Sequence, residues 1–301
     1  MVTRSLSTVS VSKPFVMIVM PGTLHVTKLA LSFVPSHVNI ILILNGLSRW
    51  ERRWCDAHLR AVAKITSRCS LAHHEVLELL FEHLHSDFGI MDSDLFVLDP
   101  VYFNKIQFIG ERASLNAFFV ERNESTGILI PLTFFLFFNR SSMLAVKAKY
   151  RVGCRPYSWQ QLPAGAQAVL LRLGFGPQNY AQSYKTYFDT LQTLTLLGMA
   201  DGFPFATLET WPAISTPSEK LFHVGAVSYW GDLDHIWKIR GGFFSIRALE
   251  ESSDPQLRKY YAKRFGAVSS EVLKMRLCND KQPTGPEFFD FVEHLLRRGG
   301  N

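Results

Sequence analysis

Several patterns that define common protein classes are missing from this 301-residue sequence. Its four cysteines form no C-x-x-C pair, so we expect free thiols in a reduced, cytoplasmic protein. The longest apolar run, residues 127–138, contains Pro131 and Thr133 and is far shorter than the roughly 20 residues of a membrane span. The chain has no basic–aromatic repeat and no low-complexity segment, which argues against a nucleic-acid partner.

The composition favours a globular protein with an anionic partner. Hydrophobic residues make up 47% of the chain, enough for the core of one large domain or two small ones. The formal net charge of +6 suits a nucleotide sugar, a nucleic acid or an anionic membrane surface and does not choose among them. Peripheral contact with the inner face of a membrane is therefore an open alternative to a fully cytoplasmic location, and the oligomeric state stays open.

The first hundred residues alternate between short apolar runs and helical segments. We expect strands at residues 15–20 and 38–44, a third short strand that starts near residue 87 and ends on two carboxylates, and helices at 25–33, 48–64 and 70–85. The helix at 48–64 begins with a capping-box spacing, Ser48 followed by Glu51. Continuous apolar runs are typical of buried parallel strands, so the pattern predicts an α/β fold with a mostly parallel central sheet and flanking helices.

The rest of the chain has a less regular pattern. We expect strands at residues 118–120, 127–138, 203–208 and 221–227, and helices at 164–173 and 187–200. Residues 140–158 are expected to form a mixed, irregular connection. From about residue 247 the chain is charged and helical, which predicts a helical C-terminal tail closed by a helix at 287–298.

Two carboxylates follow the third predicted strand, in the stretch Asp92-Ser93-Asp94. Because strand side chains alternate, Asp92 and Asp94 point to one face and Ser93 to the other. Like charges this close repel unless a cation lies between them, and Mg²⁺ or Mn²⁺ prefers such oxygen ligands and also binds phosphate oxygens. A solvated pair of aspartates after an edge strand is the alternative.

Three turn-forming or acidic stretches come directly after predicted strands. They are Pro21-Gly22-Thr23, Asn45-Gly46 and Asp92-Ser93-Asp94. The binding crevice of a parallel sheet lies at the carboxyl ends of its strands, so we expect these stretches to converge there. The candidate ligand-binding residues are Pro21, Gly22, Thr23, Asn45, Asp92, Ser93 and Asp94.

Four stretches, taken in order, resemble a nucleotide-sugar glycosyltransferase of the GT-A fold. Residues 15–23 resemble its first strand and donor loop, and residues 70–94 resemble its D-x-D strand with the preceding helix. Residues 188–191 resemble the segment where inverting members place a catalytic base, although this chain has Phe188-Asp189 where those members commonly have Glu-Asp. Residues 221–225 resemble the late strand whose histidine, here His223, closes the metal site.

The resemblance implies a GT-A-like, Rossmann-like fold that transfers a sugar from a nucleoside-diphosphate sugar to an acceptor hydroxyl. It implies Mn²⁺ or Mg²⁺ held by Asp92, Asp94 and His223, with Asp189 as general base. The acceptor is a carbohydrate, a lipid-linked molecule or a small molecule. Residues 1–12 are then a frayed end, 13–100 the nucleotide-sugar half, 101–245 the acceptor-side half of one domain, and 246–301 a helical extension.

Other interpretations remain at this level. A haloacid-dehalogenase-type phosphohydrolase also places D-x-D after a strand, but carries Thr or Val where this chain has Phe96. A non-catalytic nucleotide-sugar-binding protein is a second alternative. Nucleotidyl transfer is a third, but the first loop of this chain has no glycine-rich Lys/Arg signature. Asp189 is alternatively a helix N-cap and His223 a hydrogen-bonded strand residue. Glu209, Asp232 and Asp234 are the next candidate bases, and Tyr229 and Trp230 are candidates for stacking on a ring.

Overall fold

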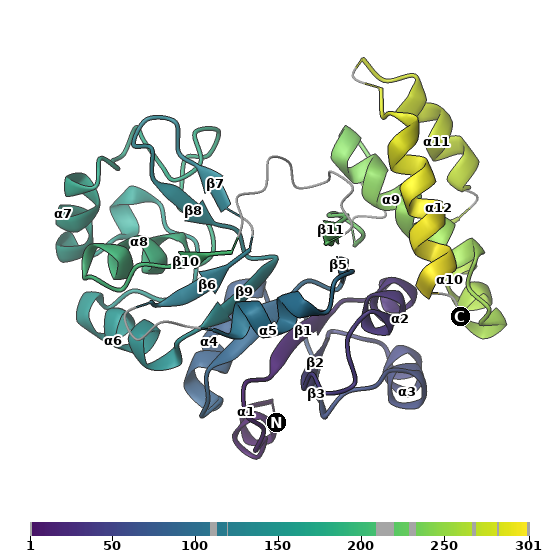
Figure 1. Cartoon of the computed structure of the whole chain (residues 1–301), viewed down its shortest axis with the longest axis horizontal. Helices are drawn as coiled ribbons and strands as arrows, with labels where there is room; N and C mark the ends of the chain where they lie inside the picture. The colour runs from purple at the N-terminus through teal and green to yellow at the C-terminus, as the bar shows by residue number, and fades with distance from the viewer. Residues whose placement is uncertain are drawn as a thin grey trace.

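The computed structural model describes residues 2–108, 113–118, 120–208, 220–228, 233–266, 269–281 and 283–299. Within these ranges a seven-stranded sheet has the order β10-β6-β9-β4-β1-β2-β3. Helices cover both faces of the sheet, and a group of C-terminal helices lies at one end of the molecule (Figure 1). The α/β fold with a mostly parallel central sheet and flanking helices is therefore confirmed.

The parallel half of the sheet comes from the first hundred residues. It contains β1 (Phe15–Val19), β2 (Ile40–Asn45), β3 (Ala63–Ser67) and β4 (Phe88–Met91), connected by α2 (Leu24–Ser32), α3 (Arg49–His58) and α4 (His73–His83). Alternate side chains of β1 enter two different cores: Phe15 packs on one side of the sheet and Val16 on the other. Burial on both faces explains why these strands are continuous apolar runs.

The predicted helix at 48–64 is only partly correct. Its capping box is present, because Ser48 Oγ accepts from Glu51 N (3.1 Å) and Glu51 Oε2 accepts from Ser48 N (2.9 Å). The helix ends at His58, however, and the last two residues of the predicted helix, Ala63 and Lys64, belong to strand β3 instead. β3 lies at the sheet edge with Ile65 buried and Lys64 half-buried, so it lacks the long apolar run of its neighbours.

The other half of the sheet is partly antiparallel. β9 (Phe135–Phe138) lies between β4 and β6 (Leu115–Ala117) and is antiparallel to both, while β10 (Ala206–Thr207) pairs with β6. β7 (Val120–Arg122) and β8 (Leu129–Pro131) form a separate antiparallel pair. α5 (Val101–Gln107) follows β5 (Leu95–Val97), which pairs with β11 (Leu221–His223).

Further segments also differ from the sequence-based expectations. Residues 140–158 are not irregular throughout, because they contain α6 (Arg140–Tyr150), which is capped by the side chain of Asn139 accepting from Ser142 N at 3.0 Å. Within the segment expected to fray, α1 (Val2–Ser7) forms and buries Leu6 in the core. α7 (Ala164–Arg172) follows the prediction closely, whereas α8 (Gln192–Ala200) starts later than residue 187.

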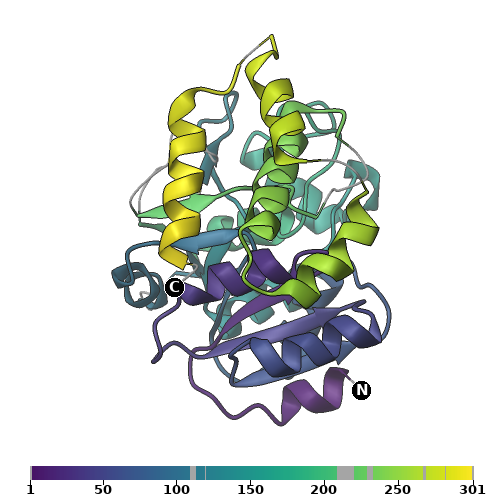
Figure 2. The same ribbon diagram turned by 90° about the vertical axis from the view of Figure 1, so that its right-hand side faces the viewer.

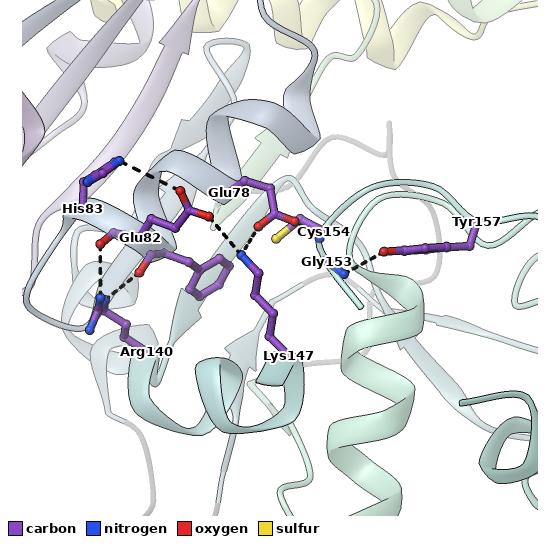
Figure 3. Close-up of polar contacts among 9 residues, drawn as sticks. Glu78, Glu82, His83, Arg140, Lys147, Gly153, Cys154 and Tyr157 are labelled. Carbon is purple, nitrogen blue, oxygen red and sulfur yellow. Dashed lines mark hydrogen bonds and ion pairs between the residues drawn. The ribbon is translucent and has the colours of Figure 1, made fainter. Parts of the chain in front are cut away.

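A polar cluster fixes α4 against α6 and the loop that follows α6 (Figure 3). The Glu78 carboxylate accepts from Lys147 Nζ and from the backbone N–H of Cys154. Burial, followed by the nearby Glu78 carboxylate, raises the pKa of the Cys154 thiol well above its usual value, which favours a protonated thiol packed in the core. Arg140 Nε donates to Phe81 O at 2.9 Å and satisfies a carbonyl near the end of α4.

The C-terminal part of the chain is helical, as predicted. It contains α9 (Ile236–Glu250), α10 (Pro255–Phe265), α11 (Ser270–Cys278) and α12 (Pro286–Gly299). Phe243 and Phe244 of α9 belong to the same buried cluster as Phe15 of the central sheet. α9 also runs across the position 245/246 that was predicted as a boundary. The division of the chain into domains stays a prediction.

A buried histidine joins α2 to α9. His25 Nε2 lies 2.9 Å from both the carbonyl oxygen and the hydroxyl of Ser245. Burial lowers the pKa of His25 from 6.5 to about 3, and the hydrogen bond to the backbone carbonyl of Ser245 opposes this only partly. The folded protein therefore keeps a neutral imidazole at a pH where the unfolded chain takes up a proton.

We expect this histidine to make folding sensitive to acid. Above pH 6.5 its contribution is fully present, and it is lost progressively as the pH falls from 6.5 towards 3. The free energy of unfolding should decrease by up to about 1.4 kcal/mol per pH unit in this window, because one extra proton binds the unfolded state. Urea unfolding of wild type and His25→Gln between these pH values measures the effect.

The control for this experiment is the exposed His85, replaced as His85→Gln. The His25→Gln protein should show a shallower dependence of unfolding free energy on pH than either wild type or the control. Parallel curves for all three proteins would show that His25 is not the group responsible.

Candidate active site

A cleft of about 920 Å³ opens at the carboxyl ends of the parallel strands β1, β2 and β4. Its lining includes half of the residues predicted to converge there, namely Asn45, Asp92, Ser93 and Asp94, but not Gly46 or residues 21–23. The polar residues lining it include Asn45, Ser70, His73, Asp92, Ser93, Asp94, Asp189 and His223. The topology produces this convergence, because parallel neighbours end at the same edge of the sheet.

The Asp92-Ser93-Asp94 stretch is a turn between two short strands, β4 and β5, where one strand was predicted. Leu95 N donates to Asp92 O at 3.2 Å and closes the turn. Asp92 N donates to Phe134 O at 3.0 Å, which ties the turn to the loop before β9. Asp94 is only 7% exposed, so its carboxylate needs a compensating charge.

The His223 imidazole reaches these carboxylates from a distant part of the chain. β11 pairs antiparallel with β5 and places His223 opposite Leu95, while Val224 N donates to Asp94 O at 3.2 Å. His223 Nε2 then lies 3.4 Å from Asp94 Oδ1 and 3.5 Å from Asp92 Oδ2. The three residues that the resemblance assigned to a metal site are therefore adjacent in space.

The electrostatics of His223 are dominated by its two carboxylate neighbours. Burial lowers the pKa of His223, but Asp94 and Asp92 outweigh this effect and raise the pKa to about 9. Phe134 stacks on the imidazole with ring centroids 3.9 Å apart and an interplanar angle of 24°. The ring orientation is thus fixed by packing on one side and by charge on its edge.

The donor set also fits a divalent cation. One atom from each of Asp92, Asp94 and His223 lies within 4.8 Å of the other two, which is the spacing of ligands around a single ion. Two carboxylate oxygens suit Mg²⁺ or Mn²⁺, which usually keep further positions for water and phosphate oxygens. A metal ion and a proton on His223 Nε2 are alternatives here, since each neutralises the same carboxylates.

Asp189 lies on another wall of the cleft. It does not cap a helix, because α8 begins after Leu191, which has a left-handed backbone and no side-chain cap. Its Oδ1 accepts from Thr190 N at 2.8 Å, and its Oδ2 forms an ion pair with Lys185. The N-cap alternative is therefore wrong, and the carboxylate is held in place at the cleft.

The loop Pro21-Gly22-Thr23 was predicted to bind the ligand, but its described contacts are with the rest of the fold. Gly22 N donates to Glu51 Oε1 at 3.1 Å, and the fully buried Thr23 donates its hydroxyl to Met20 O at 2.8 Å. The residues Pro21, Gly22 and Thr23 are not among those described as lining the cleft, whereas Met20 is. Their polar groups serve the fold at the end of β1, so a direct role in binding stays only a prediction.

Asn45 lines the cleft and also builds one of its walls. Its side-chain amide donates to Leu71 O at 2.9 Å, and its oxygen accepts from Leu71 N at 2.8 Å. This double hydrogen bond holds residues 70–73 beside the carboxylates. Asn45 thus acts chiefly on the shape of the site.

Of the other residues proposed from the sequence as bases or stacking partners, the structure describes only one. Glu209, Tyr229, Trp230 and Asp232 lie outside the described residues. Asp234 is described and its Oδ1 accepts from Lys238 Nζ at 2.9 Å. It stays a reserve candidate for a base.

Three aromatic residues of the cleft were not singled out for the site by sequence reasoning. Phe134 stacks on His223, while Tyr184 and Trp237 line the cleft with exposed fractions of 71% and 49%. Phe134 belongs to an apolar run that indicates only a buried strand, and the other two lie in segments without a recognisable motif. Their exposure on a concave surface is visible only in the tertiary structure.

The fold and the site together define an α/β protein with a carboxylate–imidazole cleft at the carboxyl ends of parallel strands. Residues 5–143 match the family described as StrH glycosyltransferase N-terminal domain. The chain is also similar to dTDP-dihydrostreptose–streptidine-6-phosphate dihydrostreptosyltransferase of Streptomyces griseus, with 36% identity over 86 residues. That alignment covers 28% of this chain and 22% of the relative.

Solved structures with some likeness to this chain include two of the glycosyltransferase GlyE of Streptococcus pneumoniae TIGR4. The apo form has a TM-score of 0.38 at 14% identity, and the other a TM-score of 0.34 at 12% identity. Each likeness covers 66% of this chain and 46% of the GlyE chain. With scores this low, the support for a glycosyltransferase rests on the sequence matches.

No helix within the described ranges has both the length and the apolar character required to cross a bilayer.

Proposed function

We propose that this protein is a metal-dependent glycosyltransferase with a GT-A-like fold, which transfers a sugar from a nucleoside-diphosphate sugar to an acceptor hydroxyl. The observation that carries the proposal is the cluster of Asp92, Asp94 and His223 in a large cleft at the strand ends. The match of residues 5–143 to a glycosyltransferase family supports it, because both carboxylates lie inside the matched segment.

The donor side of the proposed site is built around charge. Asp92, Asp94 and His223 would hold Mn²⁺ or Mg²⁺, which offsets the negative charge that develops on the departing nucleoside diphosphate. Asn45 and residues 70–73 form the adjacent wall. The relative from Streptomyces griseus is named for a dTDP-sugar donor. For this chain we propose a donor of the same general class, a nucleoside-diphosphate sugar, and leave its base open.

The acceptor side lies near Asp189. We propose that its carboxylate takes the proton of the acceptor hydroxyl as the new glycosidic bond forms. Lys185 holds Asp189 in position, and Tyr184 and Trp237 offer ring faces on which a sugar or another ring can pack. The acceptor is a carbohydrate, a lipid-linked molecule or a small molecule.

The alternatives are less favoured. In haloacid-dehalogenase-type phosphohydrolases the D-x-D motif opens the domain, whereas here it follows β4, after three earlier strands. The family match also concerns glycosyltransferases. A non-catalytic nucleotide-sugar-binding protein shares the fold and the site, and a measurement of turnover separates it from the enzyme.

The test is a thermal-shift screen of nucleoside diphosphates and nucleoside-diphosphate sugars, each with Mn²⁺ and with a chelator. We expect at least one donor to raise the melting temperature strongly when Mn²⁺ is present and much less without it, because ligands that bind only the folded state stabilise it. Sugar transfer or slow donor hydrolysis should then be measured with that donor. Stabilisation by simple phosphoesters, with release of phosphate, would instead support the phosphohydrolase.

A further inference from the structure

Helices α3 and α10 are far apart in the sequence but adjacent in space, and together they form a basic surface. Leaving aside residues 264 and 265, α3 and α10 together carry six Arg or Lys residues and two acids, Glu51 and Asp56. Glu51 is buried, where it accepts from Tyr261 OH at 3.1 Å, so it offers no charge to the surface. Figure 2 shows the two helices side by side, α3 in blue and α10 in yellow-green, on the face turned to the viewer.

A stacked aromatic pair joins the two helices. The rings of Trp50 and Tyr260 have centroids 4.0 Å apart and an interplanar angle of 13°. Ser48 Oγ lies 3.0 Å from Tyr260 OH, and Trp54 Nε1 donates to Asp254 Oδ2 at 2.7 Å. Trp50 and Tyr260 are both half-buried, so part of the stack reaches the surface.

The cations flank this stack in the same way on both helices. Arg49 and Arg53 lie one residue before and three residues after Trp50, and Lys259 and Lys263 have the same offsets from Tyr260. Residues four apart share a helix face. All four cations are exposed, and none of them forms an ion pair with any part of the chain that the structure describes.

Both pairs of cations point away from the core. On α3 the core-facing side chains are Trp54 and Cys55, and on α10 they are Leu257 and Tyr261, all buried. The cations lie on the opposite faces of these helices, since they are about half a turn away. Two acids lie near these cations. Asp254 accepts hydrogen bonds as the N-cap of α10, and Asp56 is an exposed acid on α3.

We propose that this basic surface, made of Arg49, Arg53, Lys259 and Lys263 around the Trp50–Tyr260 stack, docks the protein on an anionic phospholipid membrane. Cations near an anionic bilayer contribute about 1 kcal/mol each. Trp and Tyr favour the level of the lipid headgroups, where their rings are part apolar and part polar. The inference does not depend on the proposed sugar transfer, because none of these residues lines the cleft.

The experiment is vesicle flotation of the full chain at low ionic strength, where surface charges are least screened. Wild type should bind phosphatidylcholine vesicles that contain about a third phosphatidylserine, and should not bind pure phosphatidylcholine. The variant Arg53→Gln/Lys259→Gln/Lys263→Gln should bind about 100-fold more weakly, from three lost contributions of about 1 kcal/mol each.

The matched control removes three exposed arginines from the opposite end of the molecule, as Arg151→Gln/Arg155→Gln/Arg172→Gln. It changes the net charge by the same amount and should bind anionic vesicles like wild type. Equal loss in both variants, or no binding of wild type to anionic vesicles, would overturn the proposal. Binding of wild type to RNA but not to vesicles would also overturn it, in favour of a nucleic-acid surface. Circular dichroism and melting temperature check that each variant is folded.

Discussion

Asp94→Asn is expected to lower the rate of sugar transfer by about 10³-fold or more, since metal stabilisation of transition-state charge is worth several kcal/mol. The substitution preserves the size of the side chain but removes a carboxylate that is 7% exposed and lies 3.4 Å from His223 Nε2. The same variant should lose the part of nucleotide binding that depends on Mn²⁺. Initial rates with a saturating donor, and donor affinity with and without metal, measure both effects.

The control for this variant is Asp290→Asn, which removes an exposed carboxylate on α12. It should leave the rate unchanged. A melting temperature close to that of wild type shows that Asp94→Asn is folded. If the folded Asp94→Asn protein keeps its activity and wild type is insensitive to chelation, the donor site has been assigned to the wrong residues.

The second large effect is expected from Asp189→Asn. Removal of a general base should lower kcat by about 10²-fold or more and leave donor affinity near that of wild type. His223→Ala should show the opposite pattern, with weaker metal and donor binding as the main change, because the imidazole faces Asp92 and Asp94. The two variants therefore separate in a comparison of kcat with donor affinity.

Lys185→Met is the companion variant for Asp189, because Lys185 forms the ion pair that holds the carboxylate. It should lower kcat less than Asp189→Asn does, since the base itself remains. If Asp189→Asn lowers only the melting temperature while the folded fraction turns over normally, the carboxylate is structural. Asp234 is then the next base to test among the candidates that the structure describes.

The sequence by itself determined the elements whose signals are local. Continuous apolar runs specified β1, β2 and β4, because a strand buried on both faces needs apolar residues throughout. The spacing of Ser48 and Glu51 specified the start of α3 through two hydrogen bonds within four residues. The position of Asp92 and Asp94 after a parallel strand was enough to place them at the sheet edge.

Local signals were insufficient where packing decided the structure. β3 forms by pairing in parallel with β2, although its first two residues, Ala63 and Lys64, were predicted to be helical. α6 forms through its Asn139 cap and through burial of Met143 and Val146, despite a polar start that is typical of a loop. In both cases tertiary contacts outweighed a weak intrinsic preference.

The site itself required the tertiary structure. His223 reaches Asp94 only because β11 pairs with β5, and no residue near either strand in the sequence encodes that pairing. The resemblance to a known family suggested the set of three, but the contact between them is a property of the folded chain. Phe134, Tyr184 and Trp237 join the cleft for the same reason. Sequence periodicity determines which face of an element is buried, whereas contacts between distant elements determine which side chains meet.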